Sequence, residues 1–129
     1  MKTKQIVEYR YYNIPENEYV LPLLGGDWRG IYGNECDPLH FHNLMEIGIC
    51  HEGSGYMILD TSKVSYSEEC ITIIPANYPH VTVGREKTVN YWEYLFIDPE
   101  YVLNEIYGND NEFINKMLEK LNKTGHFRE

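Results

Sequence analysis

The chain of 129 residues is 43% hydrophobic and 24% charged, which predicts one globular domain that buries a core of its own. Its 20 acidic residues outnumber the 11 basic ones and give a formal net charge of −9. This charge argues against direct binding to nucleic acid or to an anionic membrane, because both need clustered Lys and Arg. There is neither a membrane-length apolar run nor the apolar core of a secretory signal, so we expect a cytoplasmic protein without a membrane partner.

Turn-forming residues interrupt the first three quarters of the chain at intervals of about 8–12 residues, which is typical of an all-β sandwich or barrel. Short runs rich in Val, Ile, Tyr and Phe lie between these turns. The clearest strands that this pattern predicts cover residues 6–14, 28–32, 44–50, 56–60, 70–75 and 89–97. We therefore expect residues 1–97 to form one β-barrel.

Helical spacing of apolar residues then replaces the strand pattern, and residues 98–129 are expected to form a helical extension with two short helices. Asp98 suits the N-cap of the first helix, and Pro99 suits its first position. Gly108 is expected to end this helix. The extension is expected to lead into a further region that the chain does not contain.

The second helix is expected to start at Asn109, with Glu112 completing a capping box, and to end at Gly125. One apolar stripe follows its length: Phe113, Ile114, Met117, Leu118 and Leu121. Such a stripe most simply packs on the outside of the barrel. The alternative is an interface that joins two copies in a homodimer.

The three cysteines, Cys36, Cys50 and Cys70, lie far apart in the sequence and form no CxxC motif. Cysteines that bind zinc usually come in close pairs, so this spacing argues against a zinc site built from them. We interpret them as small buried side chains in a reducing compartment.

Four side chains in the middle of the chain have the chemistry of metal ligands. His40, His42 and Glu46 are all even-numbered, so on one strand they would share a face, and His80 on a neighbouring strand could join them. Imidazole and carboxylate suit a divalent transition metal such as Zn, Ni, Fe or Mn. The alternative is a hydrogen-bonded polar cluster that contacts an organic ligand and needs no metal.

Aromatic side chains are candidates for the wall of a ligand cavity. Trp92, Tyr94 and Phe96 share one face of a predicted strand, and Trp28 and Tyr32 share a face of an earlier one. Rings next to hydroxyl groups would suit a sugar, whose C–H faces stack on rings while its hydroxyls need polar partners. Packing in the core is the competing interpretation for each of them.

Together these residues resemble the two motifs of the cupin superfamily, a double-stranded β-helix or jelly-roll barrel. The first motif has a glycine, HxH, a glutamate and a later glycine; the second has a glycine followed by Pro-x-Gly-x-x-His. The matching residues are Gly33, His40, His42, Glu46, Gly53, Pro75 and His80. Glu69 and Asn77 stand where the second motif has its glycines, and Asn77 is the milder departure because asparagine tolerates the left-handed conformation.

Residues 30–107 further resemble the N-terminal domain of AraC-type transcription regulators. The resemblance implies a barrel that senses a small-molecule effector, often a sugar, and a missing C-terminal domain that binds DNA. It implies no enzymatic activity and no required cofactor. The side chains that we expect to contact the effector are Trp28, Tyr32, His40, His42, Glu46, His80, Trp92 and Tyr94. The alternatives are a small metal-dependent cupin enzyme of dioxygenase or isomerase type, and a sugar-binding or structural cupin without a DNA partner.

Overall fold

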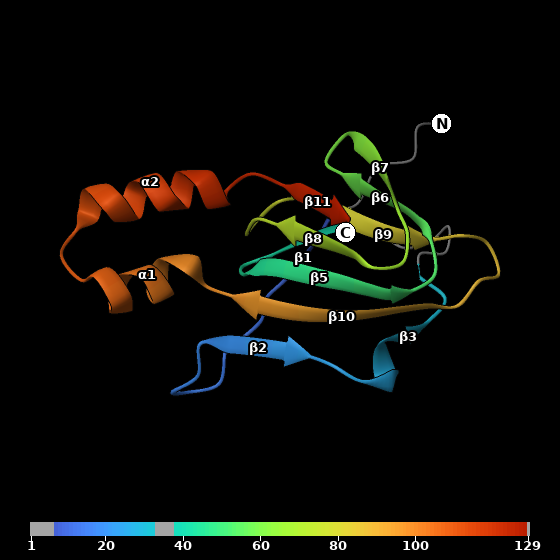
Figure 1. Cartoon of the computed structure of the whole chain (residues 1–129), viewed down its shortest axis with the longest axis horizontal. Helices are drawn as coiled ribbons and strands as arrows, with labels where there is room; N and C mark the ends of the chain where they lie inside the picture. Colours follow the sequence, from blue (N-terminus) through green and yellow to red (C-terminus); the bar gives the residue numbers. More distant parts are fainter. Residues whose placement is uncertain (1–6, 33–37, 129) are drawn as a thin grey trace.

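The computed structural model describes residues 7–32 and 38–128, in which two β-sheets face each other and two helices follow (Figure 1). The strands are β1 (Val7–Arg10), β2 (Val20–Leu23), β3 (Arg29–Gly30), β4 (Leu39–His42), β5 (Met45–Glu52), β6 (Gly55–Leu59), β7 (Ser62–Tyr66), β8 (Cys70–Ile74), β9 (His80–Gly84), β10 (Asn90–Ile97) and β11 (Gly125–Arg128). The helices are the 3₁₀ helix η1 (Gly26–Trp28), α1 (Pro99–Tyr107) and α2 (Asn111–Leu121). The all-β fold class with two trailing helices is thus confirmed. Gly33 and Cys36 lie outside the described residues.

One sheet has the strand order β1-β4-β9-β6-β7, and the other has β11-β8-β5-β10-β2 with β3 beside β10. Both sheets contribute side chains to one core, from Met57 and Leu59 on β6 to Ile74 on β8. Along β10 buried and half-buried residues alternate strictly, and Trp92 and Phe96 are on the buried face, as their spacing predicts.

Two tight turns require a left-handed backbone at residues that are not glycine. Glu69 precedes β8 with φ of 67°, and Asn77 lies between β8 and β9 with φ of 62°. The expectation that Asn77 tolerates this conformation is confirmed. The β5–β6 turn uses Gly53 with φ of 102°, where a side chain would collide with the buried Asn90.

The strand expected over residues 28–32 is much shorter in the structure. Trp28 ends η1, and only Arg29 and Gly30 pair with β10. Tyr32 follows without strand structure and donates its hydroxyl to the carbonyl of Trp28. Its contact with Trp28 therefore comes from a local turn and not from a shared strand face.

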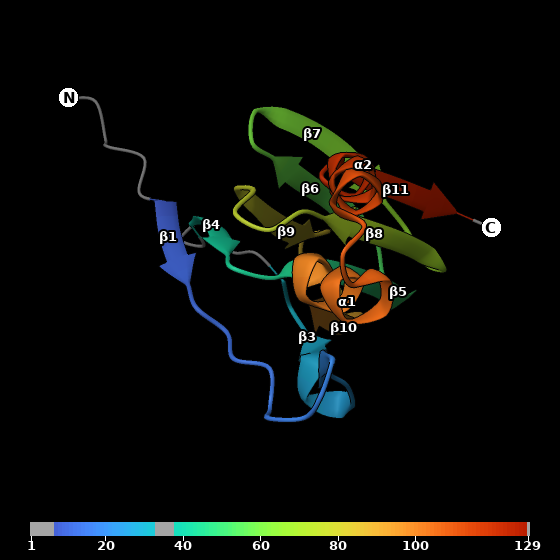
Figure 2. The same ribbon diagram turned by 90° about the vertical axis from the view of Figure 1, so that its left-hand side faces the viewer.

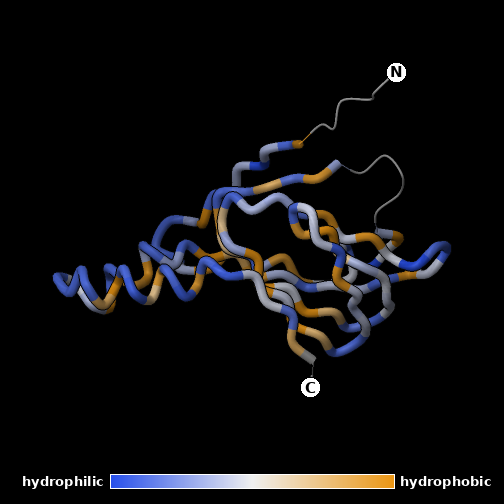
Figure 3. The backbone as a smooth tube through the Cα atoms, turned by 90° about the horizontal axis from the view of Figure 1, so that it is seen from above, coloured by the Kyte–Doolittle hydropathy of each residue, from blue (hydrophilic) through white to orange (hydrophobic). Residues whose placement is uncertain are grey.

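The two helices extend from one end of the sandwich and pack mainly against each other (Figures 1 and 3). The Asp98 side chain accepts a hydrogen bond from the Tyr101 N–H at 3.3 Å, and Gly108 ends α1, as expected. The second N-cap was predicted one residue too early, because Asp110 accepts from the Phe113 N–H at 3.1 Å.

Helix α2 packs against α1, and Phe113 of its apolar stripe contacts Tyr107 with ring centroids 4.6 Å apart. Ile114 is the buried member of the stripe, and Leu103 is its buried counterpart on α1. No helix among the described residues is long and apolar enough to cross a membrane.

The last residues form a strand that the sequence analysis did not predict. β11 pairs antiparallel with β8, placing Phe127 opposite Ile71, so the chain returns to the sheet after α2 (Figure 2). The expectation of a helical segment throughout residues 98–129 was therefore wrong at its end. Gly125 follows the helix, but it begins a strand.

Candidate ligand and metal site

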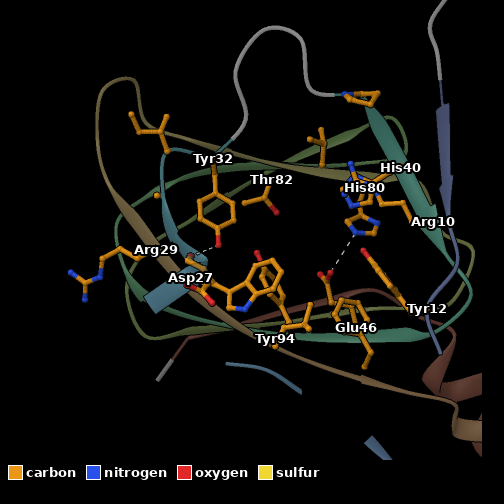
Figure 4. A pocket seen from close by; sticks show the side chains of 17 residues that line it. Arg10, Tyr12, Asp27, Arg29, Tyr32, His40, Glu46, His80, Thr82 and Tyr94 are labelled. Atoms are coloured by element: carbon orange, nitrogen blue, oxygen red, sulfur yellow. Dashed lines mark hydrogen bonds and ion pairs between the residues drawn. The ribbon is translucent and has the colours of Figure 1, made fainter. Parts of the chain in front are cut away.

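A cavity of about 360 Å³ lies between the two sheets and is lined from β1, β2, η1, β3, β4, β5, β9 and β10. His40, His80 and Glu46 lie at one end, whereas Tyr32 and Tyr94 lie at the other (Figure 4). Its volume is within the range of pockets that hold small molecules. The cavity therefore joins an ionisable end to an aromatic end.

The histidines come from neighbouring strands of one sheet. His40 on β4 is directly opposite His80 on β9, and the His42 ring centroid lies 4.8 Å from that of His80. Glu46 belongs to β5 in the facing sheet. The expectation that His40, His42 and Glu46 share one strand was wrong, because the chain changes sheets in a two-residue turn after β4. The carboxylate consequently faces the imidazoles across the interior.

Backbone carbonyls fix the orientation of two of these rings. Nδ1 of His42 lies 2.8 Å from the Leu44 carbonyl oxygen, and Nδ1 of His80 lies 2.8 Å from that of Tyr78. A carbonyl only accepts, so both Nδ1 atoms carry the proton. Both Nε2 atoms then point toward Oε1 of Glu46, at 3.4 and 3.7 Å. Two neutral imidazoles would present lone pairs to the carboxylate, so a proton or a cation is needed between them.

The electrostatics of the cluster favour an ionised carboxylate among imidazoles. Burial opposes ionisation of Glu46, but the adjacent His42 and His80 lower the pKa of its carboxyl below the ordinary value. Burial also opposes the charged form of His80, yet the Glu46 carboxylate raises the pKa of that imidazole. Burial, followed by the nearby His80, lowers the pKa of His40 to about 4. In the absence of a metal, His40 is therefore the neutral imidazole at neutral pH.

The same side chains could hold a metal ion. One ligand atom from each of His40, His42 and His80 lies within 4.8 Å of the others. Nδ1 of His40 and Nε2 of His42 and His80 are buried and lack a hydrogen-bond partner. Metal-binding histidines typically donate the second ring N–H to a carbonyl, as His42 and His80 do here. Glu46 lies outside this group of three but next to it, since its Oε1 is 3.4 Å from Nε2 of His42. Imidazole and carboxylate ligands suit Zn, Ni, Fe or Mn.

Four of the five aromatic side chains expected in the cavity wall line the cavity: Trp28, Tyr32, Tyr94 and Phe96. Trp28 and Tyr94 meet edge to face with ring centroids 6.2 Å apart, and Tyr32 lies beside them. Burial raises the pKa of the Tyr94 phenol, so this hydroxyl stays protonated and can donate a hydrogen bond. Trp92 has no exposed surface and stacks under Tyr94 within the core, so it does not line the cavity.

Of the expected effector contacts, six line the cavity: Trp28, Tyr32, His40, Glu46, His80 and Tyr94. His42 does not line it, since its ring lies in the interior, where Leu44 and Glu46 contact it. The two other histidines behave as surface residues. Nε2 of His51 lies within hydrogen-bond distance of Oε1 of Glu93, at 2.7 Å, and His126 is exposed on β11.

No family model matches the chain, and neither does any curated protein. Among solved structures, the crystal structure of an apo variant of ToxT from Vibrio cholerae is similar at 13% sequence identity, with a TM-score of 0.46. The similarity covers 87% of this chain and 42% of that one. The chain thus spans less than half the length of this neighbour.

Several lining residues were missed by sequence reasoning. Thr82 could have been found, because it is two residues after His80 on the same strand face. Arg10 lies opposite His42 in the parallel β1–β4 pair, and both Arg10 and Tyr12 line the cavity. Such pairing between distant segments leaves no local signal. Asp27 is placed by η1, which no sequence pattern indicated.

Proposed function

We propose that this chain is the effector-sensing domain of an AraC-type transcription regulator, in which a cupin barrel binds a small molecule. The observation that carries this proposal is the 360 Å³ cavity, because small barrels otherwise fill their interior with side chains. The AraC-like pattern of residues 30–107 supports the regulator class. A net charge of −9 agrees with DNA contacts made by a separate, basic domain.

The backbone conformation supports the cupin assignment at the two positions where the residue differs from the glycine of the second cupin motif. Glu69 and Asn77 replace motif glycines, and both adopt the positive φ that glycine favours. The turn geometry is therefore retained although the glycines are absent. Pro75 and His80, the other residues of the second motif, flank the same turn between β8 and β9.

The lining suits a polyhydroxylated ligand such as a sugar. Trp28 and Tyr94 offer ring faces for C–H groups at one end of the cavity. Tyr12 and Thr82 offer hydroxyls, and Nδ1 of His40 is buried without a partner. The ligand would satisfy such groups, whose burial without a hydrogen bond is costly.

We further propose that a divalent transition metal binds His40, His42, Glu46 and His80 in this domain. Three of these four residues also line the cavity, so an effector with hydroxyl or carboxylate groups would have access to the ion. The ion would supply the positive charge that the buried Glu46 requires among carbonyl-anchored imidazoles. The sensing function does not depend on it, because the cavity exists without it.

A metal-dependent cupin enzyme of dioxygenase or isomerase type is the second candidate. The anchoring of His42 and His80 through Nδ1 favours it, because this arrangement is typical of functional metal sites. A bound metal would supply Lewis acidity next to the substrate. The enzyme assignment is disfavoured because, among the described residues, the sequence motifs place no second acid/base pair in the cavity.

Metal content measured by mass spectrometry tests the site directly. We expect close to one equivalent of a transition metal in the wild-type chain, and its loss in His42→Ala. His51→Ala, which removes an exposed imidazole, should retain the metal. Because His42 is buried, Glu46→Gln provides a second variant, and circular dichroism verifies that each variant is folded. A metal-free wild type after growth in metal-supplemented medium would overturn the metal site.

A thermal-shift screen with sugars tests the sensing function. A ligand of the cavity should raise the melting temperature of the wild type and lose most of this effect in Tyr94→Phe. Steady consumption of the ligand by the purified chain would instead favour the enzyme. We also expect the coding sequence to continue past Glu129 into two helix-turn-helix units, and a stop codon there would contradict the regulator assignment.

A further inference from the structure

A pair of cysteines lies inside the sandwich, away from the histidine cluster. Cys50 on β5 and Cys70 at the start of β8 are free thiols with no exposed surface. On β5, Cys50 is four residues beyond Glu46, which corresponds to about 13 Å of strand. No part of the proposed ligand or metal site uses either thiol. The pair is thus an independent feature of the fold.

The sheet register sets the two cysteines against each other. β5 and β8 run antiparallel with Ile49 opposite Ile71, so the next residues along the ladder are Cys50 and Cys70. The N–H of Glu69 donates to the Cys50 carbonyl at 2.8 Å, so the two segments still lie side by side at this point. Residues opposite each other in an antiparallel pair have Cα separations of about 4.5–5.5 Å, which lies within the range that a disulfide spans.

The two thiols are close enough for each to shift the pKa of the other. The Cys50 sulfur also lies 3.6 Å from the Glu52 carbonyl oxygen. Both cysteines point into the same core cluster, with Cys50 opposite Trp92 on β10. Bond formation would therefore need little backbone movement.

The surroundings make the two thiols unequal. The neighbouring Cys50 thiol lowers the pKa of the Cys70 thiol despite its burial, and His126 on β11 adds to this effect. The neighbouring Cys70 thiol, followed by burial, raises the pKa of Cys50. The thiolate is the nucleophilic form of cysteine, so Cys70 is the one suited to react first.

We propose that Cys50 and Cys70 form a reversible disulfide in response to peroxide, with Cys70 as the attacking thiol and Cys50 as the resolving thiol. The Cys70 thiolate attacks one peroxide oxygen and the O–O bond breaks, which leaves a sulfenic acid and, after protonation, one water. The Cys50 sulfur then attacks the Cys70 sulfur, and the hydroxyl leaves with the Cys50 proton as a second water. In total, two thiols and one peroxide give one disulfide and two waters.

The location of the pair explains how a small oxidant can reach it. Cys70 directly follows the tight turn at Glu69, and the four-residue edge strand β11 pairs with β8 beside it. Short edge strands open locally far more often than the whole domain unfolds. The disulfide would link β5 to β8, and thereby fix the strand that carries Glu46.

Peptide mapping tests the proposal, with Cys36→Ser as the parent because Cys36 and Cys50 share the tryptic peptide 30–63. The folded protein is treated with hydrogen peroxide, blocked with N-ethylmaleimide and digested. We expect peptide 30–63 joined to peptide 64–85, and release of both by dithiothreitol. Two maleimide-blocked thiols after treatment, in protein that circular dichroism shows to be folded, would overturn the disulfide.

Single-cysteine variants test the roles of the two thiols in the same background. Cys50→Ser should leave Cys70 as a sulfenic acid that dimedone traps, whereas Cys70→Ser should leave Cys50 largely unmodified. Equal trapping in both would contradict the assignment of the attacking thiol. If either variant fails to fold, the pH dependence of disulfide formation in the Cys36→Ser parent decides: the rate should rise with thiolate formation well below the ordinary thiol range near pH 8.5. A rise only near that range would contradict the assignment.

Discussion

His40 and His80 lie directly opposite each other across the β4–β9 pair, and their ring centroids are 4.4 Å apart. Two imidazolium charges at this separation repel each other, and burial adds to the cost. The sheet register therefore makes the protonation of one ring depend on the other. Because Glu46 raises the pKa of His80, His40 is the ring that stays neutral.

The first prediction concerns the pH dependence of stability in metal-free protein. The pKa of His40 is about 4 in the folded chain and about 6.5 when unfolded, so the unfolded chain binds the proton first as pH falls. The contribution of neutral His40 to the free energy of unfolding is therefore lost as the pH falls from about 6.5 to about 4. One pKa unit corresponds to about 1.4 kcal/mol, and the partial solvent exposure of His40 reduces its effect, so His40→Gln should gain about 2 kcal/mol relative to the wild type as the pH falls through this window. Urea unfolding with a chelator present measures this difference; a difference independent of pH would contradict the neutral His40.

The second prediction concerns the ion pair in the interior. Glu46→Gln removes the charge that raises the pKa of His80, so His80 should titrate at lower pH in the variant. Proton NMR of the histidine Cε1–H resonances in metal-free protein measures this change. The resonance of the exposed His51 is the internal control, because this side chain contacts Glu93 and not Glu46. An unchanged His80 titration would mean that another group stabilises its charge.

The third prediction separates core packing from cavity lining in β10. Trp92 is fully buried between Tyr66 and Tyr94, so Trp92→Ala should cost about 3–5 kcal/mol of unfolding free energy. Tyr94→Phe keeps the ring and should change stability by less than about 1 kcal/mol. The same substitution should weaken a sugar ligand by about tenfold through loss of one hydrogen bond. Urea unfolding and calorimetric titration measure the two effects; similar stability losses in both variants would contradict this division.

Local patterns predicted much of this fold. Alternation predicted the buried face of β10, and polar side chains before apolar runs predicted the first helix start at Asp98. The second helix was predicted to start at Asn109 because Glu112 stands three residues later, as in a capping box, but Asp110 is the N-cap in the structure. Both residue types can cap a helix, and the backbone path decides between them. These cases depend on neighbours in the sequence.

Three other errors have a common cause, which is contact between distant segments. The turn after His42 moves the chain to the other sheet. Strand alternation therefore predicted the correct cluster, although it placed Glu46 on the same strand as His40 and His42. β11 forms only because β8 offers an open edge to Phe127 and its neighbours. Trp92 and Tyr94 have the same parity, and the sequence cannot show that one ring lies beneath the other.

The last prediction tests the close packing of the sheet interior. Gly48 lies on β5 where an added Cβ would be 2.6 Å from Oγ1 of Thr72 and 3.1 Å from the Trp92 ring. Gly48→Ala should therefore cost about 1–3 kcal/mol through overpacking, whereas Gly30→Ala, with no atom within 4 Å of its added Cβ, should cost little.

Oγ1 of Thr72 has no hydrogen-bond partner, so Thr72→Ala removes the closest obstacle without breaking a hydrogen bond. In the Thr72→Ala background the cost of Gly48→Ala should fall by at least about 0.5 kcal/mol, because the two substitutions act on one contact. Part of the cost should remain, since the Trp92 ring is still close. Urea unfolding of the two single variants and the double variant measures this coupling. Additive effects would mean that the backbone of β5 shifts to accept the methyl group.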